Sequence, residues 1–301
     1  MTDVKLVEVG PRDGLQNEAT VLSASTRVEL IERLANAGLR HIEAGSFVSP
    51  KWVPQMAGSA DVLQALLPKK NMANVHLPVL TPNVQGYQLA REAGAREVAI
   101  FGAASETFSQ KNINCSIAES LQRFEAIQAL AHADNVALRG YVSCLVACPY
   151  EGDISPAQVI PVVRRLFELG CYEVSLGDTI GRGTPHSVRR VLRALLAEFP
   201  AEKLALHLHD TYGMAVANLM TGLELGIRTI DASVGGAGGC PYANGASGNV
   251  ATEEVVYLLE REGLDTGVNL NALVDTGHWL YQQLGKPVVS RVNQALFGKQ
   301  G

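Results

Sequence analysis

The sequence lacks the features that mark several large classes of protein. No apolar stretch approaches the roughly 20 residues of a membrane-spanning helix. Long runs of one charge are also missing, and a net charge of −5 offers no basic surface for nucleic acid or an anionic membrane. The five cysteines are dispersed without a CxxC spacing, which indicates a reducing compartment rather than a disulfide framework. We therefore expect a globular protein that binds neither nucleic acid nor membrane.

Short β-rich segments alternate with segments of helical spacing along the chain. The β-rich segments are Val4–Val9, His41–Ala44, Val75–Leu80, Glu97–Phe101, Ala137–Ser143, Tyr172–Leu176, Lys203–His209 and Thr229–Val234. The clearest helical segments are Thr26–Ala37, Ser116–His132, Pro156–Leu169, Thr184–Glu198, Gly213–Leu225, Ala251–Arg261 and Asn269–Leu284. Several stretches of this kind end at a glycine, as at Gly38, Gly94, Gly170 and Gly226, which is typical of a helix C-terminus. This alternation predicts βαβ units and a parallel sheet.

Eight such units predict a (β/α)8 barrel, a fold that commonly takes about 250 residues as one domain. A doubly wound sheet is the alternative. The hydrophobic content of 47% allows a large core, and no linker or break in composition indicates a second domain. We expect one domain over residues 1–301, with a barrel core of about residues 4–262 and a helical extension over 263–301.

His207 and His209 form a His-x-His pair in the seventh β-rich segment. Side chains two positions apart lie on one face of a strand, so the imidazoles would project together. Such a pair, with a carboxylate, suits a divalent metal ion, whereas two hydrogen-bonded core histidines are the alternative. Active sites of barrels lie at the C-terminal ends of the strands, where Asp13 can supply the carboxylate. Asn249 is either a helix N-cap or a further ligand through its amide oxygen.

Arg12 and Cys240 also follow predicted strands. Arg12 is a fixed planar cation that can stabilise developing oxygen charge, although a salt bridge to Asp13 within a turn is the alternative. Cys240 follows four glycines in residues 235–239, and an exposed thiol there can act as acid, base or nucleophile. The glycine-rich loop lacks the Gly-Lys-Ser/Thr of a phosphate-binding loop, so nucleoside triphosphate binding is not expected.

Six motifs together resemble the hydroxymethylglutaryl-CoA lyase family. They are GPRDGLQNE at 10–18, SFVSPKWVPQM at 46–56, GYVSC at 140–144, SLGDT at 175–179, HLHDTYG at 207–213 and GGCPYA at 238–243. The resemblance runs from Val4 to about Leu284, and the last motif is the one most specific to the lyases. It implies cleavage of 3-hydroxy-3-methylglutaryl-CoA to acetyl-CoA and acetoacetate in leucine breakdown. It also implies an acyl-CoA-binding homo-oligomer, with a dimer favoured. Because no transit peptide is recognisable, we expect the bacterial cytoplasm.

The resemblance further implies roles for single residues. Asp13, His207, His209 and Asn249 would bind Mg²⁺ or Mn²⁺. Arg12 would stabilise the thioester enolate, Cys240 would handle a proton, and Glu43 and Asp178 would organise acid–base chemistry beside the metal. Ser46, Ser175 and Thr179 would contact the substrate carboxylate with Gln16 and Tyr141 nearby, and Lys111 and Asn112 would contact coenzyme A.

Several alternatives stay open at this stage. The substrate can be a longer 3-branched homologue such as 3-hydroxy-3-isohexenylglutaryl-CoA. A Claisen-type synthase of the same superfamily would lack the cysteine loop, and a non-enzymatic barrel would lack metal ligands. Either Asp13 or Glu43 can take the proton from the substrate hydroxyl.

Overall fold

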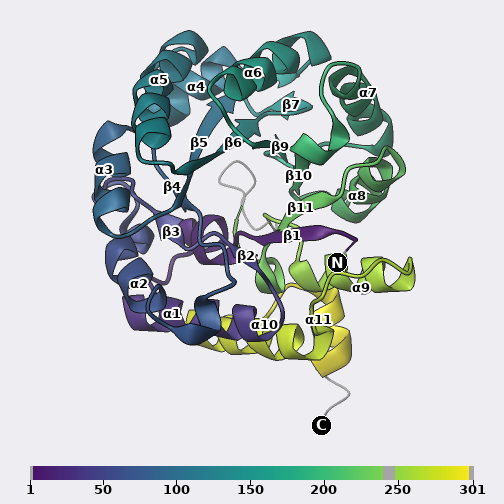
Figure 1. Ribbon diagram of the computed structural model, residues 1–301. Helices are drawn as coiled ribbons and strands as arrows, with labels where there is room; N and C mark the ends of the chain where they lie inside the picture. The colour runs from purple at the N-terminus through teal and green to yellow at the C-terminus, as the bar shows by residue number, and fades with distance from the viewer. Residues whose placement is uncertain (1–2, 240–247, 298–301) are drawn as a thin grey trace.

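A computed structural model describes residues 3–239 and 248–297 of the chain. Its parallel strands form a ring that helices enclose (Figure 1). The strands of the ring are β1 (Lys5–Glu8), β2 (His41–Ile42), β3 (Gly45–Ser46), β4 (Val79–Leu80), β5 (Glu97–Ala103), β6 (Ala137–Ser143), β9 (Glu173–Asp178), β10 (Leu204–Leu208) and β11 (Thr229–Ala232). A separate antiparallel hairpin, β7 (Ala147–Cys148) and β8 (Gly152–Asp153), follows β6.

The ring of strands is closed. Its order is β2-β1-β11-β10-β9-β6-β5-β4-β3, and its two ends, β2 and β3, are consecutive in the chain. Between them, Glu43 N donates to Glu8 O and Ala44 N donates to Pro78 O, each at 2.9 Å, so this stretch pairs on both sides. β2 and β3 are therefore halves of one barrel strand. This closure confirms the predicted (β/α)8 barrel and excludes a doubly wound sheet, whose edge strands stay open.

Helices surround the ring and close each βα unit. They are α1 (Ala24–Asn36), α2 (Ser59–Leu66), α3 (Val84–Glu92), α4 (Glu106–Ile113), α5 (Ile117–Ala133), α6 (Pro156–Glu168), α7 (Pro185–Leu196), α8 (Ala215–Glu224), α9 (Thr252–Arg261), α10 (Leu270–Leu284) and α11 (Arg291–Phe297). α10 packs against α1 and α9, and α11 packs against α9 and α10 (Figure 1). Within the described ranges, no helix combines the length and apolar character needed to cross a bilayer.

Local sequence signals determine where several helices begin and end. At the start of α5, the Ser116 hydroxyl accepts a hydrogen bond from Glu119 N, and the Glu119 carboxylate accepts one from Ser116 N. The glycine stops are confirmed, because four of them have φ angles between 83° and 112°: Gly38, Gly94, Gly170 and Gly226. These stops direct the chain from each helix towards the next strand.

Two of the predicted strands are interrupted in the structure. The segment Val75–Leu80 forms only β4 and an isolated bridge between His76 and His41. Pro78 lies between the two and has no N–H to donate to a neighbouring strand. In the segment His41–Ala44 the ladder is interrupted after Ile42. The expected elements are therefore present, but their bounds are set by pairing with neighbours.

The main apolar core lies between the strands and the surrounding helices. Ile100 of β5 and Leu166 of α6 are both fully buried in it. Inside the ring, by contrast, Arg139 Nε contacts Glu173 Oε1 at 2.9 Å and Arg139 Nη2 contacts Asp231 Oδ1 at 2.7 Å. Because side chains alternate along a strand, the same strands present apolar residues to the helices and charged residues to the barrel interior. The barrel thus carries charged groups in its interior, below its C-terminal mouth.

Candidate active site

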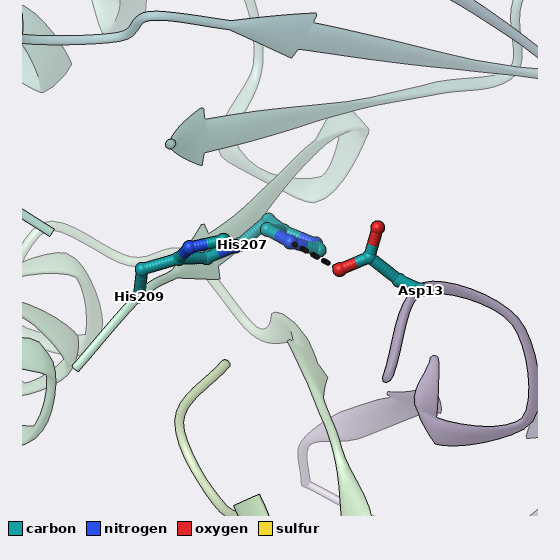
Figure 2. Close-up of side chains that lie close together, drawn as sticks. All are labelled: Asp13, His207 and His209. Atoms are coloured by element: carbon teal, nitrogen blue, oxygen red, sulfur yellow. Dashed lines mark ion pairs between the residues drawn. The ribbon is translucent and has the colours of Figure 1, made fainter. Parts of the chain in front are cut away.

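Three groups able to bind a metal ion converge at the C-terminal mouth of the barrel. Asp13 lies in the π-helical turn η1 (Gly10–Gly14) directly after β1, His207 lies in β10, and His209 follows β10. One ligand atom from each lies within 4.8 Å of the others. Figure 2 shows the two imidazoles side by side, with Asp13 facing His207 from the opposite loop. The predicted shared face of the two histidines is thus observed.

His207 is oriented by a buried carboxylate beneath it. His207 Nδ1 lies 3.3 Å from Asp231 Oδ2, and His207 Nε2 lies 3.7 Å from Asp13 Oδ2. Burial alone would raise the pKa of Asp231, but Arg139 and His207 hold this pKa below its usual range. Asp231 is therefore ionised and can only accept hydrogen bonds. His207 Nδ1 must therefore carry the proton. Its Nε2 is left to face Asp13 and the space between the ligands.

His209 and Asp13 have the protonation states that a metal ligand needs. Burial and the nearby His207 lower the pKa of His209 to about 4, so the ring is neutral at pH 7. His209 Nδ1 is buried and has no hydrogen-bond partner among the described residues. Burial would raise the pKa of Asp13, but Arg12 and the two histidines lower it to about 2. Burial would lower the pKa of His207, but Asp231 and Asp13 raise it. Two imidazoles and one carboxylate, with an unsatisfied ring nitrogen on His209, fit a divalent metal ion.

Asn249 and Gln16 hold Asp13 from two sides. Asn249 Nδ2 donates to Asp13 Oδ2 at 2.9 Å, and Gln16 Nε2 donates to Asp13 Oδ1 at 3.0 Å. Asn249 also forms a backbone bridge with His209, so it lies beside the Asp13–His207–His209 cluster. Its amide turns the nitrogen towards Asp13, whereas ligation requires the oxygen. A half-turn of the amide exchanges the two atoms, and Asn249 as a ligand stays a prediction.

Arg12 connects Asp13 to a second buried carboxylate. Its Nη1 donates to Asp13 Oδ1 at 2.7 Å and its Nε donates to Glu43 Oε2 at 2.8 Å. The Arg12 guanidinium carbon also lies 5.5 Å from the centre of the Tyr141 ring. Burial raises the pKa of Glu43 even though Arg12 opposes the shift. The salt bridge to Asp13 is thus present, but it is one of three contacts that fix a planar cation at the barrel mouth.

Glu8, at the end of β1, joins the loops that follow the first and last barrel strands. Its Oε1 accepts from Gly10 N at 2.8 Å and from Val234 N at 2.9 Å, and its Oε2 accepts from the Thr252 hydroxyl at 2.6 Å. Burial raises the pKa of Glu8 to about 7, while these hydrogen bonds oppose the shift. One carboxylate therefore positions both the turn that carries Arg12 and the first turn of α9.

Four other predicted residues have partners outside the Arg12–Asp13 network. The Ser46 hydroxyl donates to Leu80 O at 3.5 Å, and the Ser175 hydroxyl donates to Asp231 Oδ2 at 2.7 Å. The Thr179 hydroxyl accepts a hydrogen bond from Cys144 N at 2.8 Å. Asp178 Oδ2 accepts one from Gly183 N, also at 2.8 Å. Ser175 therefore supports Asp231 beneath the site. Burial raises the pKa of Asp178 to about 6. Their contacts with substrate stay predictions.

The residues predicted to contact coenzyme A lie on α4. Lys111 and Asn112 are both exposed, and Lys111 Nζ lies 4.7 Å from the centre of the Tyr150 ring. Tyr150 belongs to the hairpin connection between β7 and β8, so α4 and this hairpin meet here. Cys240 lies outside the described residues. Both assignments stay predictions.

Sequence reasoning missed Asp231 and Arg139, which support the site from below. Arg139 Nη1 donates to the Tyr141 hydroxyl at 2.8 Å, and both Arg139 Nη atoms reach the Asp231 carboxylate. A signal was present, because each is a charged residue within a strand of otherwise apolar character. Buried charges need partners, so an Arg and an Asp in two strands of one barrel indicate a pair. The pair holds both His207 and Tyr141.

Known proteins match the chain over nearly its full length. The HMGL-like family model matches residues 3–279. The mitochondrial hydroxymethylglutaryl-CoA lyase of Bos taurus is 56% identical over 292 residues, which cover 97% of this chain and 89% of that protein. The Homo sapiens enzyme of the same name is 54% identical over the same shares.

Solved structures agree with the sequence matches. Hydroxymethylglutaryl-CoA lyase from Pseudomonas aeruginosa superimposes with a TM-score of 0.96 at 52% identity, over 99% of this chain and 98% of that one. An HMG-CoA lyase from Acinetobacter baumannii, in complex with coenzyme A and 3-methylmalate, gives a TM-score of 0.91 at 35% identity, over 97% and 94% of the two chains. With the barrel and its Asp-His-His cluster, these matches show that the chain belongs to the hydroxymethylglutaryl-CoA lyase family.

Proposed function

We propose that the chain cleaves 3-hydroxy-3-methylglutaryl-CoA to acetyl-CoA and acetoacetate, the reaction of the lyases it resembles. The observation that carries this proposal is the Asp13–His207–His209 cluster, with both histidines buried and the Arg12 guanidinium 2.7 Å from Asp13. The cluster can hold an oxygen substituent of the substrate, and the cation can hold a second oxygen beside it. A retro-Claisen cleavage needs both.

The chemistry assigns distinct tasks to the chain's groups. The C3 hydroxyl loses its proton, the C2–C3 bond breaks, and its electrons move onto the thioester oxygen as an enolate that is then protonated at C2. Asp13, His207 and His209, with Asn249 as the fourth candidate ligand, would hold a divalent cation, which would supply the charge that lowers the pKa of the hydroxyl.

Arg12 is suited to stabilise the enolate oxygen, because Asp13, Glu43 and Tyr141 fix its position before the charge develops. Asp13 and Glu43 are the two candidates to accept the hydroxyl proton. Asp13 lies among the ligands, and Glu43 lies across Arg12 with Oε1 unpartnered within the described residues. Cys240 is proposed to protonate C2.

Purified protein is expected to release acetyl-CoA and acetoacetate in equal amounts from 3-hydroxy-3-methylglutaryl-CoA. The assay measures kcat/KM for this thioester beside that for its 3-isohexenyl homologue. A higher kcat/KM for the methyl compound supports the proposed substrate. A higher value for the isohexenyl compound would reassign the enzyme to the longer branch, and failure to cleave either would refute the proposal.

Removal of divalent metal is expected to abolish the activity, and Mg²⁺ or Mn²⁺ should restore it. In calorimetric titration with Mn²⁺, His209→Ala should lose most of the binding because a ligand is gone. Asp231→Asn keeps every ligand but loses the charge that orients His207, so binding should weaken by about 10–100-fold. His186→Ala, an exposed histidine on α7, is the matched control and should bind as the unaltered protein does. Full turnover by metal-free protein would contradict the metal assignment.

We further propose that the chain is one domain that works as a homo-oligomer, with a dimer favoured, in the bacterial cytoplasm and in leucine breakdown. Similarity over 99% of the chain to the lyase from Pseudomonas aeruginosa supports the one-domain and bacterial assignments. Sedimentation of the purified protein tests the dimer.

A further inference from the structure

A small apolar cluster lies inside the barrel, apart from the main core. Its buried members are Leu80 of β4, Ala99 of β5 and Tyr141 of β6, and Phe101 packs against them. Leu80 and Ala99 are direct neighbours in the β4–β5 ladder, and Phe101 and Tyr141 are neighbours in the β5–β6 ladder. We name Leu80, Ala99 and Tyr141 the apolar wall. It spans three adjacent strands of the barrel.

The apolar wall borders the candidate active site directly. The centre of the Tyr141 ring lies 5.5 Å from the Arg12 guanidinium carbon and 6.2 Å from the centre of the His207 ring. The Tyr141 hydroxyl is held from below by Arg139. Tyr141 is therefore the member of the wall that borders these groups, and Ala99 and Leu80 continue the wall from it across β5 and β4.

The other groups described at the site are polar or charged. β1, β10 and the segments beside them supply Arg12, Asp13, His207, His209 and Asn249, with Glu43 behind Arg12. The apolar wall is not part of the main apolar core, which lies on the other side of the strands, between them and the helices. Its position suits an apolar part of the substrate.

The substrate has one such part near its reacting carbon. C3 carries a hydroxyl, a carboxymethyl arm, the thioester arm and an apolar branch. The first three can be held by the metal ligands, by hydrogen-bond donors and by Arg12. Transfer of the apolar branch out of water lowers the free energy of binding. The apolar wall offers an apolar surface beside the groups that hold the other three substituents.

We propose that the apolar wall receives the branch at C3 and that Leu80 limits its size. The proposal rests on the lyase activity proposed above and adds which residues select the acyl group. Leu80 is only 8% exposed and Ala99 is fully buried, and both lie in paired strands, so the wall has little freedom to retreat from a longer branch. A single methylene in such a pocket changes kcat/KM by about 10–200-fold.

The test compares 3-hydroxyglutaryl-CoA thioesters with hydrogen, methyl or ethyl at C3. Leu80→Ala is expected to raise the ethyl-to-methyl ratio of kcat/KM by at least about tenfold, because it removes the groups that meet the added carbon. Leu80→Phe should lower kcat/KM for the thioester with methyl at C3 more than for the thioester with hydrogen at C3, because the larger side chain takes up the space of the branch. Leu80→Val makes the smaller change in the same direction as Leu80→Ala and serves if that variant does not fold.

Leu138→Ala is the matched control. Leu138 lies in β6, is also buried at 5% exposure, and belongs to the main apolar core. Its truncation should therefore lower the free energy of unfolding without changing the ethyl-to-methyl ratio of kcat/KM. Equal changes for methyl and ethyl in the Leu80 variants, or the same ratio change in Leu138→Ala, would overturn the role of the wall. If the unaltered protein cleaves none of the three thioesters, the lyase proposal itself is wrong, and the two failures are distinct.

Discussion

Replacement of Arg12 by lysine is expected to lower kcat by about 10²–10³-fold with little change in KM. Lysine keeps the positive charge but presents a single ammonium in place of a planar fork. In the structure, Arg12 uses Nη1 for Asp13 and Nε for Glu43, and its plane lies near the Tyr141 ring. An ammonium cannot hold both carboxylates and still face the enolate oxygen.

Steady-state kinetics on 3-hydroxy-3-methylglutaryl-CoA measure this loss. Mn²⁺ titration of the same variant is the control, because metal binding should stay close to that of the unaltered protein. Thermal unfolding shows whether the variant is folded at the assay temperature. A decrease in kcat of less than about tenfold would show that Arg12 is only a salt-bridge partner of Asp13 and Glu43. A loss of metal binding equal to the loss of rate would place its effect on Asp13 instead.

Replacement of Cys240 by serine is expected to reduce kcat by about 10²–10⁴-fold while metal binding survives. A hydroxyl is a much weaker acid than a thiol, so protonation of the enolate at C2 should become slow. Cys240 is not proposed as a ligand, and Mn²⁺ titration should be unchanged. Near-normal kcat in Cys240→Ser would transfer the proton donor role to water or to another acid such as Asp178.

The other cysteines provide an internal comparison. Cys115, Cys144, Cys148 and Cys171 are free and buried. Burial raises the pKa of Cys171 to about 12, so it should react slowly with iodoacetamide. Alkylation should therefore inactivate the enzyme in step with modification of Cys240, and a substrate analogue should slow it. Cys171→Ser is the matched control, with turnover retained. Inactivation that follows a buried cysteine would contradict the assignment.

Local sequence alone predicted the barrel and the residues of its candidate metal site. The alternation of short apolar segments with helical ones, and glycines such as Gly38 and Gly170 at helix ends, depend only on neighbours along the chain. The same holds for His207 and His209, because the two-residue period of a strand puts them on one face in any sheet. Asp13 followed from the rule that barrel strands carry function at their C-terminal ends.

The network around those ligands depended on the tertiary structure. Barrel closure and strand register, which no local pattern encodes, bring three pairs of side chains into contact. The pairs are Arg12 with Glu43, His207 with Asp231, and Arg139 with Asp231. The same closure brings Leu80, Ala99 and Tyr141 from three strands to one apolar wall. The sequence by itself thus determined the fold class and the residues able to bind metal. The tertiary structure decided which groups orient them, because charged and apolar partners far apart in the chain meet only inside the closed ring.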